Sequence, residues 1–303
     1  MIEMSYMQYR KRWSLKRRLV PVVAFSIMSC SCLAVTATDI TECDRLAAHP
    51  GDPEKRAPGV SWSNLDAKAA LIACEKAIKR QPSIARLQYQ YARILDKQKR
   101  YREAATWYGK AAEQGYASAQ NSLGYAYERG QGVPANNQKA FYWYKQAAQQ
   151  GHAQAQNNLG TLYFNGKGVA ADRQQALLWY RKAAQQGNAT AQQNIGVMYS
   201  RGYGVRQDEE AAFNWFLKAA NLDNSHAQYN VGMSYFYGKG VEPDRNKAKQ
   251  WFEKAAVNGN YQASEALRRM QFRTAYCNSL RTISKTESAA PVAGKRLRRR
   301  LCP

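Results

Sequence analysis

The amino-acid sequence repeats itself with a period of 36 residues. Aligned on their glycines, four consecutive copies read AQNSLGYAYERGQGV, AQNNLGTLYFNGKGV, AQQNIGVMYSRGYGV and AQYNVGMSYFYGKGV. The same spacing separates one tryptophan of each copy from the next, at Trp143, Trp179, Trp215 and Trp251. A fixed period of this length is typical of solenoids, in which each copy forms one supersecondary unit.

Each copy is predicted to form a pair of helices. In one copy Ala155, Leu159 and Tyr163 are spaced by four residues, which places them on one side of a first helix, and Ala176 and Trp179 begin the apolar side of a second. Neither helix can bury its apolar side alone, so neighbouring copies must stack. We therefore predict an all-α fold, a right-handed α-solenoid.

Capping residues recur at the ends of the predicted second helices. Side chains that can accept a bond from a free backbone N–H stand at the start of each one, at Asn136, Asp172, Asp208 and Asp244. Glycines end three of them, at Gly151, Gly187 and Gly259. Asp223 stands at the equivalent glycine position, which predicts a slightly different exit from that helix.

The LG..Y, GxGV, WY and KAA groups of these copies resemble the Sel1-like repeat family, a relative of the tetratricopeptide repeats. The resemblance covers about half of the chain. It implies an exported bacterial scaffold that binds a protein or peptide in signalling, envelope regulation or host interaction. Some family members are cysteine-rich and bind penicillin, but the repeats of this chain contain no cysteine.

The chain divides into six predicted parts. Residues 1–37 are a signal peptide or membrane anchor, and 38–81 a helical leader whose last helix is capped by Ser63 or Asp66 and runs through Arg80. Residues 82–116 resemble a plain tetratricopeptide pair because the GxGV loop is absent, and 117–260 hold the four Sel1-like copies. A capping helix follows over 261–281 and a disordered basic tail over 282–303.

The N-terminal segment predicts export. Six basic residues precede an uncharged apolar stretch over 19–35, and small residues allow cleavage after Ala37. An uncleaved membrane anchor and a lipoprotein with its lipid on Cys30 remain alternatives. All three place the repeats outside the cytoplasm, in a periplasmic, secreted or membrane-anchored protein.

The positive charge is concentrated at the two ends. The formal net charge is +23, to which residues 1–20 contribute six Lys or Arg and one Glu, and residues 268–303 ten Lys or Arg and one Glu. A basic tail is more typical of a solvated arm than of a nucleic-acid site. A nucleic-acid or anionic-surface partner is therefore the second alternative function.

Four cysteines lie beyond the targeting segment, namely Cys43, Cys74, Cys277 and Cys302. We favour a disulfide between Cys43 and Cys74, which closes a loop of about 30 residues and contributes roughly 3–4 kcal/mol in the chain-entropy model. Two buried thiols are the alternative, and the pairing of the other two cysteines stays open. No cysteine or histidine spacing typical of a metal site occurs, so neither a metal nor a cofactor is predicted.

No catalytic motif appears in the sequence. It lacks a nucleophile elbow, a Walker loop, a dinucleotide fingerprint and HExxH. His49, His152 and His226 are interpreted as surface residues, and the tryptophans as packing groups. The sequence therefore predicts a non-enzymatic protein, with an envelope hydrolase or penicillin-interacting protein as the first alternative.

The predicted binding surface is the concave row of first helices, by the related tetratricopeptide geometry. Positions that differ between copies are free to serve a ligand. An aromatic and apolar C-terminal end would suit an anchor for a peptide or helix, although packing between repeats explains it equally well. The candidates are Asn121, Tyr125, Arg129, Asn157, Phe164, Asn165, Gln193, Arg201, Tyr229, Met233, Phe236 and Tyr237.

Overall fold

The computed structural model describes residues 40–272, which fold into helices without strands. The predicted targeting segment, the end of the capping helix, the basic tail, Cys277 and Cys302 lie outside the described residues. The helices are α1 (Glu42–Ala47), α2 (Ala67–Arg80), α3 (Ala85–Lys97), α4 (Tyr101–Glu113), α5 (Ala117–Arg129), α6 (Asn137–Gln149), α7 (Ala153–Asn165), α8 (Arg173–Gln185), α9 (Ala189–Arg201), α10 (Glu209–Ala220), α11 (Ser225–Tyr237) and α12 (Arg245–Val257). Residues 261–272 are also helical.

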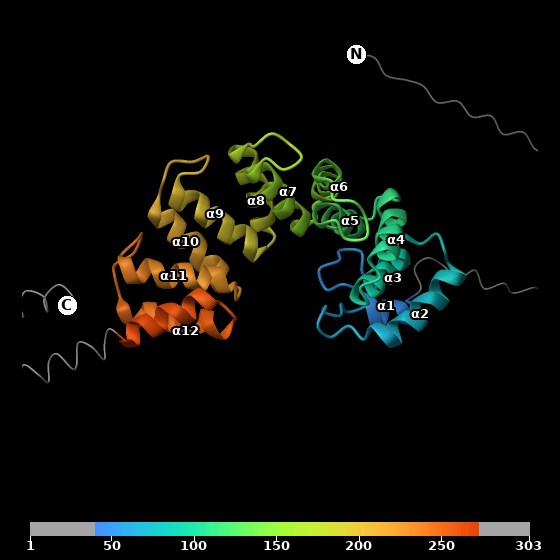
Figure 1. The fold of residues 1–303 in the computed structure, drawn as a ribbon, viewed down its shortest axis with the longest axis horizontal. Helices are drawn as coiled ribbons and strands as arrows, with labels where there is room; N and C mark the ends of the chain where they lie inside the picture. The colour runs from blue at the N-terminus through green and yellow to red at the C-terminus, as the bar shows by residue number, and fades with distance from the viewer. Residues whose placement is uncertain (1–39, 273–303) are drawn as a thin grey trace, which may run out of the picture. The chain divides into compact units, whose positions relative to one another are not determined.

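Successive helices form antiparallel pairs, and each pair packs on the next (Figure 1). The pairs are α3 with α4, α5 with α6, α7 with α8, α9 with α10 and α11 with α12. The second helix of each pair contacts the first helix of the following pair, so one apolar core continues along the row. The predicted all-α solenoid is confirmed. Across residues 40–272, no helix has the length and apolar character that spanning a membrane requires.

A glycine in the middle of α5, α7, α9 and α11 lets the two helices of each of these pairs approach closely. An added Cβ on Gly160 would lie 2.8 Å from Cδ1 of Tyr180, and one on Gly196 would lie 2.5 Å from Cδ1 of Phe216. Both distances are shorter than carbon atoms tolerate. The recurring glycine therefore pairs with a recurring aromatic ring, which explains why the two repeat with the same period.

The predicted caps of the second helices are present. Asp172 Oδ1 accepts from the backbone N–H groups of Gln174 and Gln175, each at 2.9 Å. The three predicted C-terminal glycines adopt positive φ one residue beyond the helix caps. Asp223 takes the same left-handed conformation, with φ of 58°, although α10 has 12 residues and α8 has 13. In the leader, Asp66 caps α2.

Glutamine pairs connect neighbouring repeats. The side-chain nitrogen of Gln150 donates to Gln120 at 2.7 Å, and that of Gln186 donates to Gln156 at 2.8 Å. The next repeat breaks the pattern because Leu222 stands where Gln150 and Gln186 stand. Gln192 Oε1 is consequently buried without a hydrogen-bond partner within the described part of the chain.

We expect Leu222→Gln to raise the free energy of unfolding by about 1 kcal/mol, because it supplies the missing donor to Gln192 and removes an exposed leucine. Urea unfolding followed by circular dichroism measures the change. Val257→Gln is the matched control, since Val257 is 87% exposed at the end of α12 and its replacement should change stability by less than about 0.5 kcal/mol. Equal effects of the two substitutions would show that Leu222 is not the cause of the missing hydrogen bond to Gln192.

Candidate binding cleft

The leader covers the first-helix surface at α3. Arg93, at 2% exposure, donates to the backbone oxygens of Ala47 at 2.9 Å, Ala48 at 3.0 Å and Val60 at 2.5 Å. Asp52 is buried at the start of α5, where it accepts bonds from Tyr116 and Ser118. The row of first helices is thus occupied at its N-terminal end by the chain itself.

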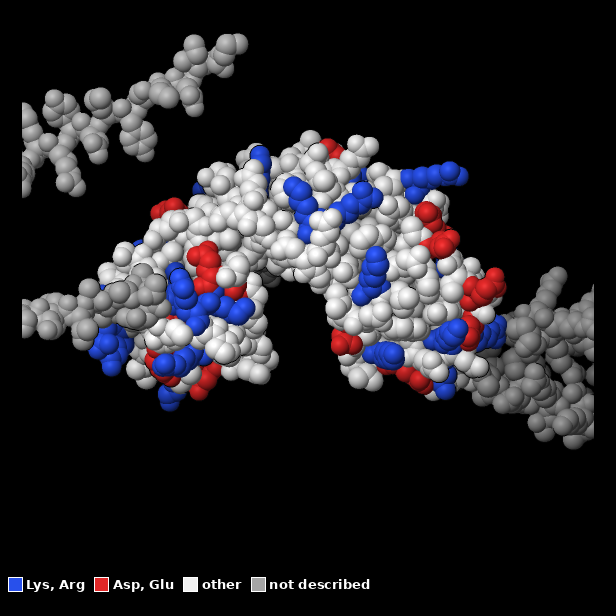
Figure 2. Space-filling view, turned by 180° about the vertical axis from the view of Figure 1, so that it is seen from behind, with Lys and Arg blue, Asp and Glu red and all other residues white. Residues whose placement is uncertain are grey.

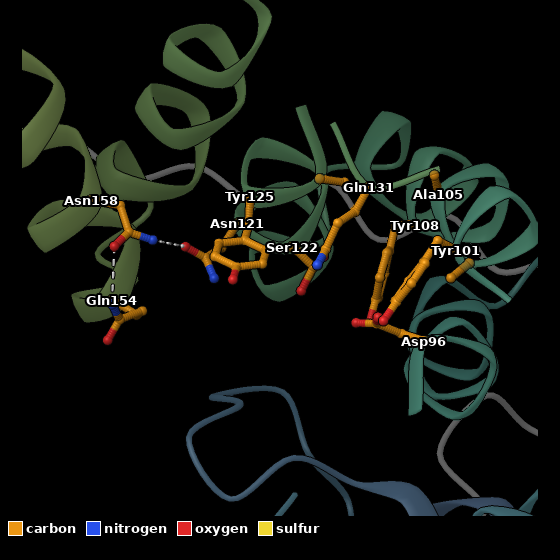
Figure 3. Close-up of a pocket in the computed structure, with 12 residues that line it drawn as sticks. Asp96, Tyr101, Ala105, Tyr108, Asn121, Ser122, Tyr125, Gln131, Gln154 and Asn158 are labelled. Atoms are coloured by element: carbon orange, nitrogen blue, oxygen red, sulfur yellow. Dashed lines mark hydrogen bonds between the residues drawn. The ribbon is translucent and has the colours of Figure 1, made fainter. Parts of the chain in front are cut away.

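A cleft of about 300 Å³ opens beside this covered region (Figure 3). It lies where α3, α4, α5 and α7 meet, together with the loop that follows α5. Its walls combine amide side chains, tyrosine rings and one carboxylate. The lining residues are Asp96, Tyr101, Ala104, Ala105, Tyr108, Asn121, Ser122, Tyr125, Ala126, Gln131, Gln154 and Asn158.

One end of the cleft is built from amides on successive first helices. Asn158 Nδ2 donates to Asn121 Oδ1 at 3.1 Å, and Gln154 Nε2 donates to Asn158 Oδ1 at 3.0 Å (Figure 3). The pattern continues in the next repeat, where Asn194 Nδ2 donates to Asn157 Oδ1 at 3.1 Å. These bonds fix the orientation of side chains that still have a free donor or acceptor.

The other end of the cleft is acidic. Tyr108 donates its hydroxyl to Asp96 Oδ2 at 3.3 Å, and Figure 3 shows Tyr101 and Tyr108 both pointing toward the Asp96 carboxylate. Burial raises the pKa of Asp96, and the bond from Tyr108 opposes that rise. Burial also raises the pKa of Tyr108 well above its ordinary value, so this hydroxyl stays protonated and remains a donor.

Two side chains that line the cleft are smaller than their equivalents in the next repeat. Ala105 is 36 residues before Phe141, and the corresponding positions further along are Leu177 and Phe213. Asp96 takes the place of Glu128, which accepts from Tyr144 at 2.9 Å as Asp96 accepts from Tyr108. Both positions therefore carry less side-chain volume at the cleft than in the following repeat.

The structure distributes the predicted binding residues over several environments. Asn121 and Tyr125 line the cleft, and Arg129 lies against the Tyr125 ring, with its guanidinium carbon 5.6 Å from the centroid. Asn157 is only 4% exposed, and its side-chain oxygen accepts the hydrogen bond from Asn194. Phe164 packs against Tyr203 in the loop that follows α9. Asn165, Gln193 and Arg201 lie elsewhere on the first helices, outside the cleft.

The aromatic C-terminal end is engaged mainly in packing within the chain. Tyr229, Met233 and Phe236 contact the cluster around Phe252, to which residues 266, 267 and 270 of the last helical segment also belong. Tyr237 is 60% exposed and touches Phe236, with ring centroids 4.9 Å apart. These four residues therefore do not meet in the cleft.

Sequence reasoning did not identify the acidic end of the cleft or the amide of Asn158. The predicted binding residues were positions that differ between copies, whereas Asn158 recurs as Asn194 and Asn230. The signal that could have revealed the cleft was the loss of bulk at Ala105 relative to Phe141. This difference lies in the first helix pair, where the GxGV loop is absent and the alignment with the other copies is therefore least clear.

The histidines have local structural contacts. His152 caps α7 by accepting from the backbone N–H of Ala155 at 3.2 Å, and His226 lies 3.3 Å from the Asn260 amide. His49 and His226 are exposed, and His152 is half-buried. Over residues 40–272, no group of three His, Cys, Asp or Glu side chains could hold a metal ion.

The fold and the cleft define a helical-repeat solenoid of the tetratricopeptide-like class. A family model described as the Sel1 repeat matches residues 88–116, 117–152, 153–188, 189–224 and 225–260, and the chain belongs to this family. The match includes the first helix pair, despite its shorter connection. The recognition of Sel1-like repeats from the sequence is confirmed.

Several solved structures are similar to this chain. A Sel1 repeat protein from Oxalobacter formigenes is 33% identical, with a TM-score of 0.59, over 67% of this chain and 88% of that protein. A protective antigen present in uropathogenic Escherichia coli strains is 31% identical, with a TM-score of 0.59, over 67% of this chain. The match spans 44% of that antigen's length. None of the curated proteins matches this chain.

Proposed function

We propose that this protein is a non-enzymatic scaffold that binds an extended segment of a partner protein on the first helices, at the cleft between α3 and α7. The observation that carries the proposal is the amide ladder, the hydrogen-bonded side chains of Gln154, Asn158 and Asn121. Asn121 and Asn158 hold each other in place and border the open cleft, so their remaining donor and acceptor groups can bind the backbone of a peptide. Sel1 repeat proteins in general mediate protein–protein interaction.

The leader shows how a chain segment docks on this surface. Arg93 occupies the position on α3 that Tyr125 occupies on α5, and it binds backbone oxygens of the leader. A first-helix side chain of this chain therefore already binds backbone oxygens, at the C-terminal end of α1 and in the loop that follows it. A partner segment in the cleft would continue the same row.

The surface charge supports a protein partner. On the face seen in Figure 2, Lys and Arg side chains are spread over the helices and interspersed with Asp and Glu. A nucleic-acid site is expected to gather basic side chains into one patch or stripe. The cleft itself is lined by neutral side chains apart from Asp96.

The proposed site of action is the bacterial envelope, outside the cytoplasm. The disulfide between Cys43 and Cys74 supports it, because such bonds persist in oxidising compartments. The basic and apolar pattern of the N-terminal segment supports the same location. Cell fractionation of a tagged full chain tests it, and recovery in the cytoplasm with both thiols reduced would contradict it.

A displayed library of random peptides tests the binding proposal. We expect peptides selected on the full chain to lose at least about tenfold in affinity for a variant with Asn121→Ala and Asn158→Ala. Tyr237→Ala is the control, since this exposed tyrosine lies on a first helix away from the cleft. Failure to select any peptide, or equal loss in the control, would count against the proposal.

A further inference from the structure

We infer that the acidic end of the cleft binds a primary ammonium group, the side chain of a lysine in the docked segment. This inference rests on the proposed function and specifies what the segment carries. Of the described residues that line the cleft, Asp96 is the only charged one. The cleft thus has a row of amides at one end and a single carboxylate at the other.

Asp96 has no cationic partner of its own. Within residues 40–272, no lysine or arginine forms an ion pair with it, although the protein is strongly basic. Two of the basic residues that follow it in the sequence are engaged elsewhere. Lys97 Nζ donates to the Trp62 backbone oxygen at 2.6 Å, and Arg100 forms two bonds of 2.8 and 2.7 Å with Glu103. A half-buried carboxylate without an ion-pair partner in its own chain favours binding of a cation from outside the chain.

The hydrogen bond from Tyr108 selects the kind of cation. It uses Oδ2 of Asp96, which leaves Oδ1 as the better acceptor for a ligand. An arginine side chain binds best to a carboxylate with two free oxygens, whereas an ammonium group acts as a compact point charge and needs only one. The remaining geometry therefore favours lysine over arginine.

The aromatic walls suit the same ligand. Tyr101 and Tyr125 both line the cleft, and tyrosine ring faces attract cations. The Tyr125 ring already shows this behaviour, because the guanidinium of Arg129 lies 5.6 Å from its centroid. Ala105 leaves room for the apolar stem of a lysine, which can pack on the rings while its ammonium group reaches Asp96.

Short blocked peptides provide the test. Acetyl-Gly-Lys-Gly-amide and its norleucine and arginine counterparts are titrated into the full chain, and the side-chain amide signals of Asn121 and Asn158 are followed by NMR. We expect saturable binding of the lysine peptide, at least about tenfold weaker binding of norleucine, and intermediate binding of arginine. Cadaverine is a further probe, expected to bind more weakly than the lysine peptide because it has no backbone for the amides.

Two variants locate the site. Asp96→Asn removes the charge but keeps an acceptor for Tyr108, and it should weaken the lysine peptide at least about tenfold while leaving the norleucine peptide unchanged. Ala105→Phe reproduces the side chain of Phe141 in the next repeat and should block the cleft to all the peptides. Tyr237→Ala is again the control, and circular dichroism checks that each variant is folded.

The outcomes separate this inference from the proposed function. If library peptides bind at the amides but lysine and norleucine peptides bind equally, or Asp96→Asn has no effect, the lysine inference is wrong and the scaffold proposal stands. If cadaverine binds as well as the lysine peptide, the ligand is a free amine and the docked segment is not its source. If no peptide binds the parent chain, both are wrong.

Discussion

Replacing Arg86 by methionine is expected to lower the free energy of unfolding by about 3–5 kcal/mol, the range observed when one partner of a buried ion pair is removed. Arg86 forms an ion pair with Asp44, and the Asp44 side chain is completely buried. Thr41 and Gln90 also donate to this carboxylate, at 2.8 and 2.9 Å. Without Arg86 they would leave a buried charge insufficiently compensated.

The effect of Arg86→Met should depend on pH. Burial alone would raise the pKa of Asp44, but the bonds from Arg86, Thr41 and Gln90 lower it below its ordinary value of 3.8. The parent therefore keeps this stabilisation above that value and loses it as the pH falls through the lowered pKa. In the variant, burial dominates and raises the pKa, so protonation of Asp44 should reduce the difference between the two proteins at acidic pH.

Arg45→Met is the matched control for this prediction. Arg45 pairs with Glu42 on the same short helix, but both side chains are more than half exposed, so the loss should be below about 1 kcal/mol. Urea unfolding at neutral and acidic pH measures both variants. A loss for Arg86→Met that matches the control, or that stays constant with pH, would show that the pair does not hold the leader.

The repeat architecture could be predicted because each local signal occurs several times. The N-caps at Asn136, Asp172, Asp208 and Asp244, and the glycine that faces an aromatic ring, recur with one period, so one interpretation had to explain all copies. The cleft depends instead on residues that differ from one copy to the next. It arises where Ala105 and Asp96 depart from their equivalents, and a departure shows its consequence only when the neighbouring helices are in place.

The leader was harder still to interpret because its contacts are distant in the sequence. Asp44 bonds with Gln90, 46 residues away, and Asp52 with Ser118, 66 residues away. Neither pairing follows from helical periodicity. Arg93 lies on a first helix, yet it is buried under the leader and binds three backbone oxygens. The sequence could indicate a separate segment before the repeats, but not that it covers their first helix.

The pairing of Cys43 with Cys74 leads to the second large expected effect. The disulfide joins α1 to α2 across a sequence separation of 31 residues. A variant with Cys43→Ala and Cys74→Ala is expected to lose about 3–4 kcal/mol in the free energy of unfolding, because the unfolded chain regains the entropy of the open loop. Dithiothreitol should destabilise the parent by the same amount and leave the double variant unchanged, which separates loss of the bond from loss of packing.

Hydrogen exchange locates the effect within the protein. Repeat proteins transmit stability mainly between neighbours, so reduction should increase exchange in α1, α2 and α3 while α9 to α12 keep the protection of the oxidised protein. Equal unfolding of oxidised and reduced protein would show that the bond is dispensable. If reduction loosens the leader, Arg93 loses the backbone oxygens that it binds, and the first-helix surface extends from the cleft onto α3. The expected consequence of reduction is therefore a longer exposed row of first helices, whereas the oxidised protein keeps α3 covered by the leader.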